Sequence, residues 1–228
     1  MKFDDTRDFP YYRHNPRIPK KWWIILLLLI PVSMMVYAAI AQTSELIGSS
    51  IFCLMLLIPL LYVSNWDYNL LFKKPTRNEI ILAVLMFAGY IAYSFIVATL
   101  LENLGLIGTG FDELLTIDFE STAALLFSIM AEELIKFIPL MFFLRLFYKY
   151  TDNRKLSIAL SSAIIIIFFG LLHYAPPYST LISVLALQGF GTIFELYGYI
   201  RTKNVLVPYI SHLLTDGIIF IMIFLGVG

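Results

Sequence analysis

Hydrophobic residues dominate this chain in seven long runs that are separated by short polar segments. Each run holds about 18 or more mostly apolar residues, enough for a helix rising 1.5 Å per residue to cross a bilayer core of about 30 Å. The runs that predict membrane-spanning helices are 22–41, 46–63, 79–101, 121–148, 156–173, 178–199 and 205–227. The pattern therefore predicts an all-α, polytopic transmembrane helix bundle of about seven spans, and any number from six to eight spans is compatible with it.

The sixth run is the weakest of the seven. Pro176 and Pro177 precede it, and Gly189 and Gly191 flank Phe190 inside it. Glycine and proline interrupt helices, so this run is compatible with one span or with two half-helices.

Composition places the chain among membrane proteins. Of its 228 residues, 60% are hydrophobic and only 14% are charged, and the mean hydropathy is +0.83, far from the balance of a soluble domain. Sixteen Lys and Arg match sixteen Asp and Glu, so the net charge is zero. No basic face for nucleic acid is visible, and the bilayer is the expected environment.

The basic residues are sorted between alternate loops, and short cytoplasmic loops collect Lys and Arg. Fifteen of the 16 lie before the first span, between spans two and three, at the junction of spans four and five, or between spans six and seven. The segment 102–120 is instead acidic, with Asp112, Glu113 and Asp118. We therefore expect residues 1–21 to form a polar cytoplasmic tail, 22–228 to form a single transmembrane domain, and the C-terminus to lie outside.

The sixteenth basic residue lies inside span four, in the stretch "MAEELIKFIPL". Glu132, Glu133 and Lys136 are expensive in a bilayer unless they face a protein interior or a water-filled cavity, which makes them candidates for function. Glu132 and Lys136 are four residues apart and share a helix face, so a partial ion pair is expected, while Glu133 points elsewhere. A purely structural ion pair that locks helix packing remains an alternative.

Two further spans carry polar residues at helical spacing. His173 follows Phe169 by four residues in "FFGLLHYAPP", and His212 and Asp216 share one helix face in "HLLTD". Such residues can converge only in a polar pocket inside the bundle, where they suit attack of water on an amide. No serine or cysteine stands out as a nucleophile. Counted along straight helices, however, His173 falls near the outer surface and Glu132 near mid-membrane.

The order Glu-Glu, FxxxH and HxxxD, each on its own helix, resembles the CPBP family (CAAX protease and bacteriocin-processing, or Abi) of intramembrane endopeptidases. The stretch 187–218 is similar to the last motif region of that family, and the resemblance covers a catalytic core of about 120–218. Members usually read EExxxR, but Phe137 occupies the arginine position here. EExxK, with Lys136, is instead like the related PrsW proteases.

The resemblance implies that Glu132, beside Glu133, acts with His173 to bind and activate a water. It implies that His212 and Asp216 stabilise the oxyanion, with Lys136 and Phe169 in support. The implied partner is a prenylated (CAAX-type) or other membrane-associated substrate, and the implied location is a bacterial or archaeal plasma membrane.

Three alternatives stay open from the sequence. No cofactor is expected to be required, but zinc held by a glutamate and two histidines would also leave a position for water. A PrsW-like protease would act on a membrane anti-sigma factor. A proton-coupled transporter would use buried Glu, Lys and His as a relay and would cleave no peptide bond.

Overall fold

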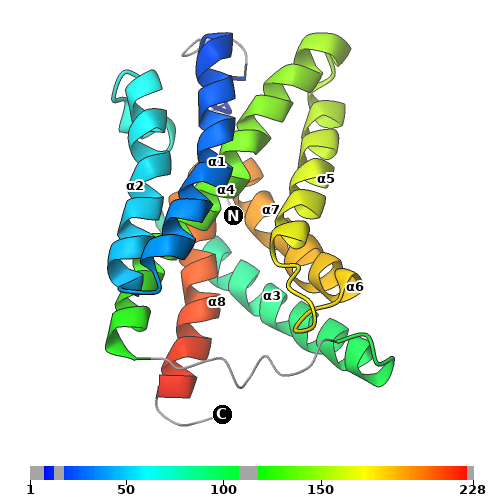
Figure 1. Cartoon of the computed structure of the whole chain (residues 1–228). Coiled ribbons are helices and arrows are strands. Elements are labelled where there is room, and N and C mark those ends of the chain that lie inside the picture. Colours follow the sequence, from blue (N-terminus) through cyan, green and yellow to red (C-terminus); the bar gives the residue numbers. More distant parts are fainter. Residues whose placement is uncertain (1–7, 13–17, 108–117, 225–228) are drawn as a thin grey trace.

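The computed structural model describes residues 8–12, 18–107 and 118–224, and these residues form helices and no β-strand. The predicted acidic residues Asp112 and Glu113 lie outside the described residues, as does most of the basic tail. The elements in chain order are α1 (Lys20–Ile40), α2 (Glu45–Val63), the short turn η1 (Tyr68–Leu70), α3 (Arg77–Asn103), α4 (Phe119–Thr151), α5 (Arg154–Leu172), α6 (Leu181–Val184), the π-turn η3 (Leu185–Gly189), α7 (Phe190–Thr202) and α8 (Leu206–Phe224) (Figure 1).

The predicted polytopic helical bundle is confirmed. Five helical segments of the described chain are long and apolar enough to cross a membrane: α1, α2, α3, α5 and the run Leu181–Thr202. The other two long helices, α4 and α8, contain most of the charged residues of the candidate site. The sixth run is one continuous helix, because α6, η3 and α7 follow one another without a break.

Polar residues fix where the helices begin. Thr76 and Glu79 form a capping box at α3, and Asp118 and Ser121 form another at α4. The Asn153 side chain accepts a hydrogen bond from the backbone N–H of Leu156 at α5. These side chains satisfy N–H groups that the first helical turn leaves without partners. The Ser121 backbone N–H also lowers the pKa of the Asp118 carboxyl, because it donates to the ionised form.

The hairpin of α4 and α5 brings two predicted site residues to one depth. α4 ends at Thr151 and α5 begins at Arg154, and Figure 1 shows the two helices antiparallel. Glu132 lies 20 residues before Asp152 and His173 lies 20 residues after Asn153, so both are about 30 Å from the turn. The sequence had predicted different depths for Glu132 and His173, because each position was counted from the membrane surface at the end of its own span. That count fails for α4, which has 33 residues and at about 50 Å is longer than a bilayer core is thick.

The connection between α7 and α8 is pinned to the loop before α3. The Asn204 side chain donates to the carbonyl of Lys73 (2.8 Å) and accepts from its N–H (3.1 Å). The N–H of Val205 donates to the carbonyl of Leu71 (3.0 Å). In Figure 1, α8 consequently begins well below the upper ends of α4 and α5, and this start places its second turn beside the middle of α4.

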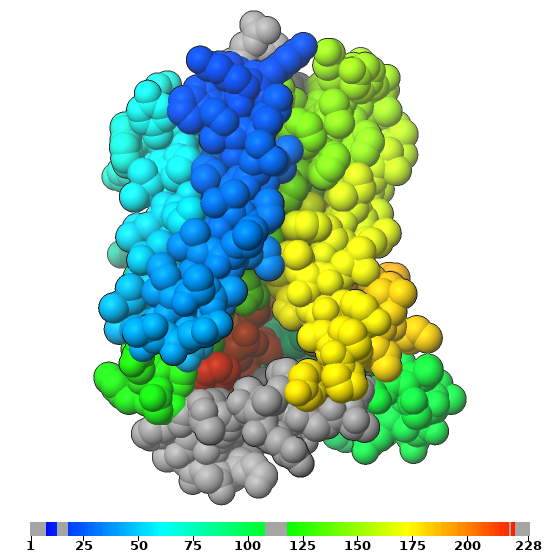
Figure 2. Space-filling model, in the orientation of Figure 1, coloured from blue at the N-terminus to red at the C-terminus, as the bar shows by residue number. Residues whose placement is uncertain are grey.

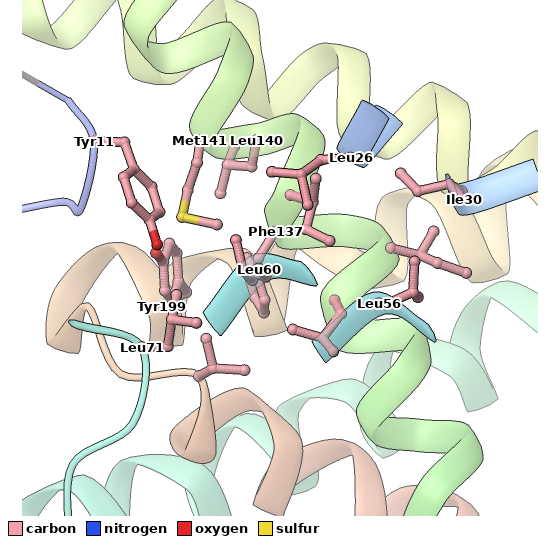
Figure 3. Packing of buried hydrophobic residues seen from close by; sticks show 14 of the residues in the cluster. Tyr11, Leu26, Ile30, Leu56, Leu60, Leu71, Phe137, Leu140, Met141 and Tyr199 are labelled. Carbon is pink, nitrogen blue, oxygen red and sulfur yellow. The ribbon is translucent and has the colours of Figure 1, made fainter. Parts of the chain in front are cut away.

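Part of the predicted polar tail is packed into the core. Phe9, Tyr11 and Tyr12 are at most 4% exposed and belong to the main hydrophobic cluster. Figure 3 shows Tyr11 pointing toward Tyr199 of α7, near Phe137 of α4. The Phe9 ring lies 5.9 Å from the Tyr199 ring, which lies 4.2 Å from the Phe137 ring. Residues 8–12 therefore fill the space between α4 and α7 on the side where α1 begins.

Candidate active site

The polar residues of α4 face two different environments. Glu133 and Lys136 are fully buried, whereas the Glu132 side chain is 31% exposed. Lys136 Nζ donates to Glu133 Oε1 at 2.5 Å. The expected ion pair between Glu132 and Lys136 is thus wrong, since Lys136 pairs with Glu133 at an i, i+3 spacing. Glu132 is left free to meet water because it lies about 100° around the helix from Glu133.

His212 and Asp216 of α8 meet the glutamates of α4, as the sequence predicted. His212 Nδ1 lies 2.7 Å from Glu133 Oε1. On the other side of the ring, Nε2 lies 3.8 Å from Glu132 Oε2 and 3.4 Å from Asp216 Oδ2. Nδ1 carries a hydrogen because its oxygen neighbours, on Glu133 and Glu195, belong to carboxylates, which only accept hydrogen bonds. The nitrogen that remains for chemistry is therefore Nε2, on the side of the more exposed Glu132.

His173 joins the site through Phe169. It caps the C-terminus of α5, and its Nδ1 lies 2.9 Å from the carbonyl oxygen of Phe169. The Phe169 ring lies 4.7 Å from the His173 ring and 4.6 Å from Lys136 Nζ. Hydrogen bonding to the Phe169 carbonyl gives His173 Nδ1 a hydrogen and leaves its Nε2 as a possible base.

One site residue, Glu195 of α7, was not predicted from the sequence. Its Oε2 accepts a hydrogen bond from Lys136 Nζ, and its Oε1 lies 3.6 Å from His212 Nδ1. Its side chain is only 12% exposed. A signal was present in the sequence, since Glu195 is the single charged residue of the predicted span 178–199, and an ionisable residue within a membrane span is a candidate by default.

A metal ion does not fit this cluster. Among the described residues, Glu133, Glu195 and His212 are the set whose ligand atoms come together, all within 4.8 Å of one another. Lys136 Nζ lies among these atoms, bonded to both carboxylates and 3.4 Å from His212 Nδ1. The ammonium therefore takes the position that a cation would need. The zinc set considered from the sequence included His173, which is not a member of this cluster.

The fold and the site together define a class. The chain is an integral membrane protein whose long helices enclose carboxylates and imidazoles beside a partly exposed glutamate, an arrangement suited to acid–base chemistry on a substrate that reaches the membrane interior.

A comparison with protein families agrees with this class. Residues 119–218 match the family model described as "Rce1-like: Type II CAAX prenyl endopeptidase Rce1-like". This region, which runs from α4 into α8, is similar to a family of peptide hydrolases, in agreement with the CAAX-type protease family that the sequence motifs predicted. No curated protein and no solved structure matches the chain.

Proposed function

We propose that this protein is an intramembrane endopeptidase that hydrolyses a peptide bond of a prenylated or membrane-associated substrate with a water molecule activated by Glu132 and His173. The observation that carries the proposal is that the adjacent residues Glu132 and Glu133 differ in burial and in hydrogen bonding. Glu133 is fully buried and hydrogen-bonded to Lys136 and His212, whereas Glu132 is 31% exposed and faces Nε2 of His212. Of these two glutamates, Glu132 is therefore the one with both the exposure to hold a water and a neighbour that can polarise the substrate.

The proposed reaction uses a carboxylate as the proton carrier. Glu132 accepts a proton from water as the water oxygen bonds to the substrate carbonyl carbon, with His173 holding the same water. His212 acts here in its doubly protonated form, in which Nδ1–H is held by Glu133 and Nε2–H donates to the developing oxyanion. Asp216, 3.4 Å from that nitrogen, either orients the ring as a carboxylate or donates to the oxyanion in its acid form. The proton on Glu132 then passes to the leaving nitrogen as the C–N bond breaks.

The proposed reaction requires no metal ion. Lys136 supplies the positive charge that a metal would otherwise bring between Glu133, Glu195 and His212. A chelator should therefore leave the cleavage rate unchanged, within about twofold, after metal-free dialysis. Loss of activity that only zinc restores would contradict this part of the proposal.

An apolar groove supports a substrate with a lipid chain. A cavity of about 350 Å³ lies between α1, α4 and α5 and is lined by residues such as Pro31, Pro139 and Phe168. Pro139 is three residues from Lys136, and Phe168 is next to Phe169, so α4 and α5 contribute residues both to this cavity and to the site. α1 and α5 both form the face seen in Figure 2, and their outward side chains, such as Leu28 and Ile167, are exposed apolar residues. A chain of isoprenoid character could therefore enter from the bilayer.

Two substitutions test the proposal. Glu132→Gln and His173→Ala should each abolish cleavage of a farnesylated peptide with a CAAX end by the purified chain in lipid nanodiscs, while the thermal transition stays in place. Glu102→Gln, which changes an exposed glutamate near the end of α3, is the matched control and should keep full activity. Cleavage that survives Glu132→Gln would refute the assignment, and transport without any peptide cleavage would favour the carrier instead.

The EExxK motif favours a second substrate class. Glu132, Glu133 and Lys136 match the first motif of PrsW proteases, whose substrate is a membrane anti-sigma factor. Comparing cleaved peptides in membranes that contain the native chain or Glu132→Gln would decide between the classes, because prenylated C-terminal ends and a transmembrane anti-sigma segment give products of different sequence and mass.

The topology proposed with this function has the N-terminus in the cytoplasm and the C-terminus outside, in a bacterial or archaeal plasma membrane. It rests on the sorting of Lys and Arg among alternate loops. A cysteine placed at Pro75 should react with a membrane-impermeant maleimide only after the cells are opened. Labelling of this position in intact cells would overturn the orientation.

A further inference from the structure

Lys136 is held from two sides, and one of its partners has no role in the reaction proposed above. Its ammonium donates to Glu133 on its own helix and to Glu195 on α7. Lys136 is fully buried and Glu195 nearly so, and a charge buried without partners is costly. Glu195 therefore decides where the ammonium lies with respect to the rest of the site.

Close packing of α7 against α3 fixes the position of Glu195. Gly191 and Gly198 lie one turn on either side of it. A Cβ atom at Gly191 would come within 2.4 Å of the Tyr90 ring, and one at Gly198 within 2.5 Å of the Met86 methyl group. The two helices can approach this closely only because both positions lack side chains, so Glu195 projects from a backbone that has little room to move.

Lys136 and His212 share one oxygen atom of Glu133. Lys136 Nζ lies 2.5 Å and His212 Nδ1 lies 2.7 Å from Glu133 Oε1, and the two nitrogens are 3.4 Å apart. Glu133 Oε2 is buried without a hydrogen-bond partner among the described residues. Both donors bind Oε1 although Oε2 could accept one of them, so a further contact must hold the ammonium in place. The hydrogen bond from Lys136 to Glu195 supplies that contact.

We propose that Glu195 is a positioning residue for peptide hydrolysis. By holding Lys136, it keeps Glu133 Oε1 directed at His212 Nδ1, and so keeps His212 Nε2 facing Glu132 and Asp216. Without this hold, the ammonium turns to the vacant Oε2, the carboxylate rotates, and the imidazole loses its fixed orientation. The inference rests on the proposed hydrolysis, because it assigns Glu195 a part in that same site.

Two variants of Glu195 separate positioning from charge. Glu195→Gln keeps an acceptor of the same length for Lys136, and Glu195→Leu removes it. With a farnesylated CAAX-ended peptide, kcat of Glu195→Leu should fall about 10- to 100-fold, the cost of misplacing a reacting group by up to about 1 Å, while KM stays within twofold. Glu195→Gln should recover most of this loss. If Glu195→Leu does not fold, Glu195→Asp replaces it, since it withdraws the acceptor by one methylene.

A second readout needs no substrate. In protein labelled with ¹⁵N-histidine, the Nδ1–H signal of His212, assigned with His212→Gln, should keep its hydrogen-bonded shift in Glu195→Gln and lose it in Glu195→Leu. An unchanged signal and a kcat within twofold of native in Glu195→Leu would overturn the inference, as would equal losses of kcat in the Gln and Leu variants. If the native chain cleaves nothing, the proposed function fails while the histidine signal still reports on Glu195.

Discussion

Replacing Gly189 with alanine should separate α5 from η3 and disturb the site from a distance. An added Cβ would lie 2.8 Å from the carbonyl oxygen of Ile166 and 3.4 Å from Gly170 Cα. Ordinary contacts begin near 3.4 Å, so the two backbones must move apart by about half an ångström. Neither atom belongs to a flexible side chain, and we expect a loss of about 1–3 kcal/mol in the free energy of unfolding, as for other overpacked sites.

The same movement of α5 should also shift His173 and lower the rate of peptide cleavage. Ile166 is one turn before Phe169 and two turns before His173 on α5. Since a shift of about 1 Å can cost about a hundredfold in rate, a shift of half that size should lower kcat about tenfold. Unfolding in mixed micelles gives the stability, and peptide cleavage by the folded fraction gives the rate.

Gly217→Ala is the matched control for stability. A Cβ at Gly217 meets no heavy atom within 4 Å, so the substitution should stabilise α8 by about 0.5–1 kcal/mol through helix propensity alone. Equal stability of Gly189→Ala and the native chain would show that the contact between α5 and η3 is not tight, and the reasoning about His173 would fall with it.

Three further predictions concern the periphery and the reaction type. Burial raises the pKa of Tyr11 from 10.0 to about 12. The contribution of the neutral Tyr11 side chain to the free energy of unfolding is therefore complete below about pH 10 and is lost as the pH rises toward 12. Tyr11→Phe should remove this pH dependence, and loss of the hydrogen bond to Ser64 should lower the free energy of unfolding by about 1 kcal/mol. If the stabilities of the native chain and of Tyr11→Phe change with pH in the same way across this range, the prediction is contradicted. Asp8→Asn should change stability by less than about 1 kcal/mol, because its ion pair with Arg154 is exposed; a larger loss in denaturant titration would contradict that. Serine- and cysteine-directed inhibitors should leave activity intact, and inactivation through a covalent adduct would overturn the carboxylate mechanism; Cys53 is buried, and burial makes a thiol unreactive.

Hydrophobic runs were enough to predict the helices but not their offsets. Each of the seven predicted spans corresponds to a helical segment within a few residues of its ends, because a bilayer-length apolar run leaves few alternatives. Relative depth was not predictable in the same way. The hairpin at Asp152 and the anchoring of Asn204 on Lys73 decide it, and the second is a contact between two connections that are 131 residues apart in the chain.

The candidate site was predictable as a set of residues but not as a network. Intramembrane charge identified Glu132, Glu133, Lys136, His212 and Asp216, and the structure brings these five together. Helix geometry alone could not say which glutamate Lys136 would choose, since spacings of three and four are both within reach. The choice follows from α7, which brings Glu195 to the same side as Glu133.

The docking of the first residues has a consequence for the order in which the chain assembles. Phe9 packs on Tyr199, a residue that lies 190 positions later in the chain, so the Phe9 ring lacks this partner until α7 has been made and inserted. Closing so long a loop adds little entropy cost beyond that of a shorter one, but it sets a sequence of events. The docking of residues 8–12 is therefore completed late, and a chain stopped before α7 would leave the Phe9 ring without Tyr199 beside it, the kind of exposed apolar surface by which chaperones and proteases recognise unfinished proteins.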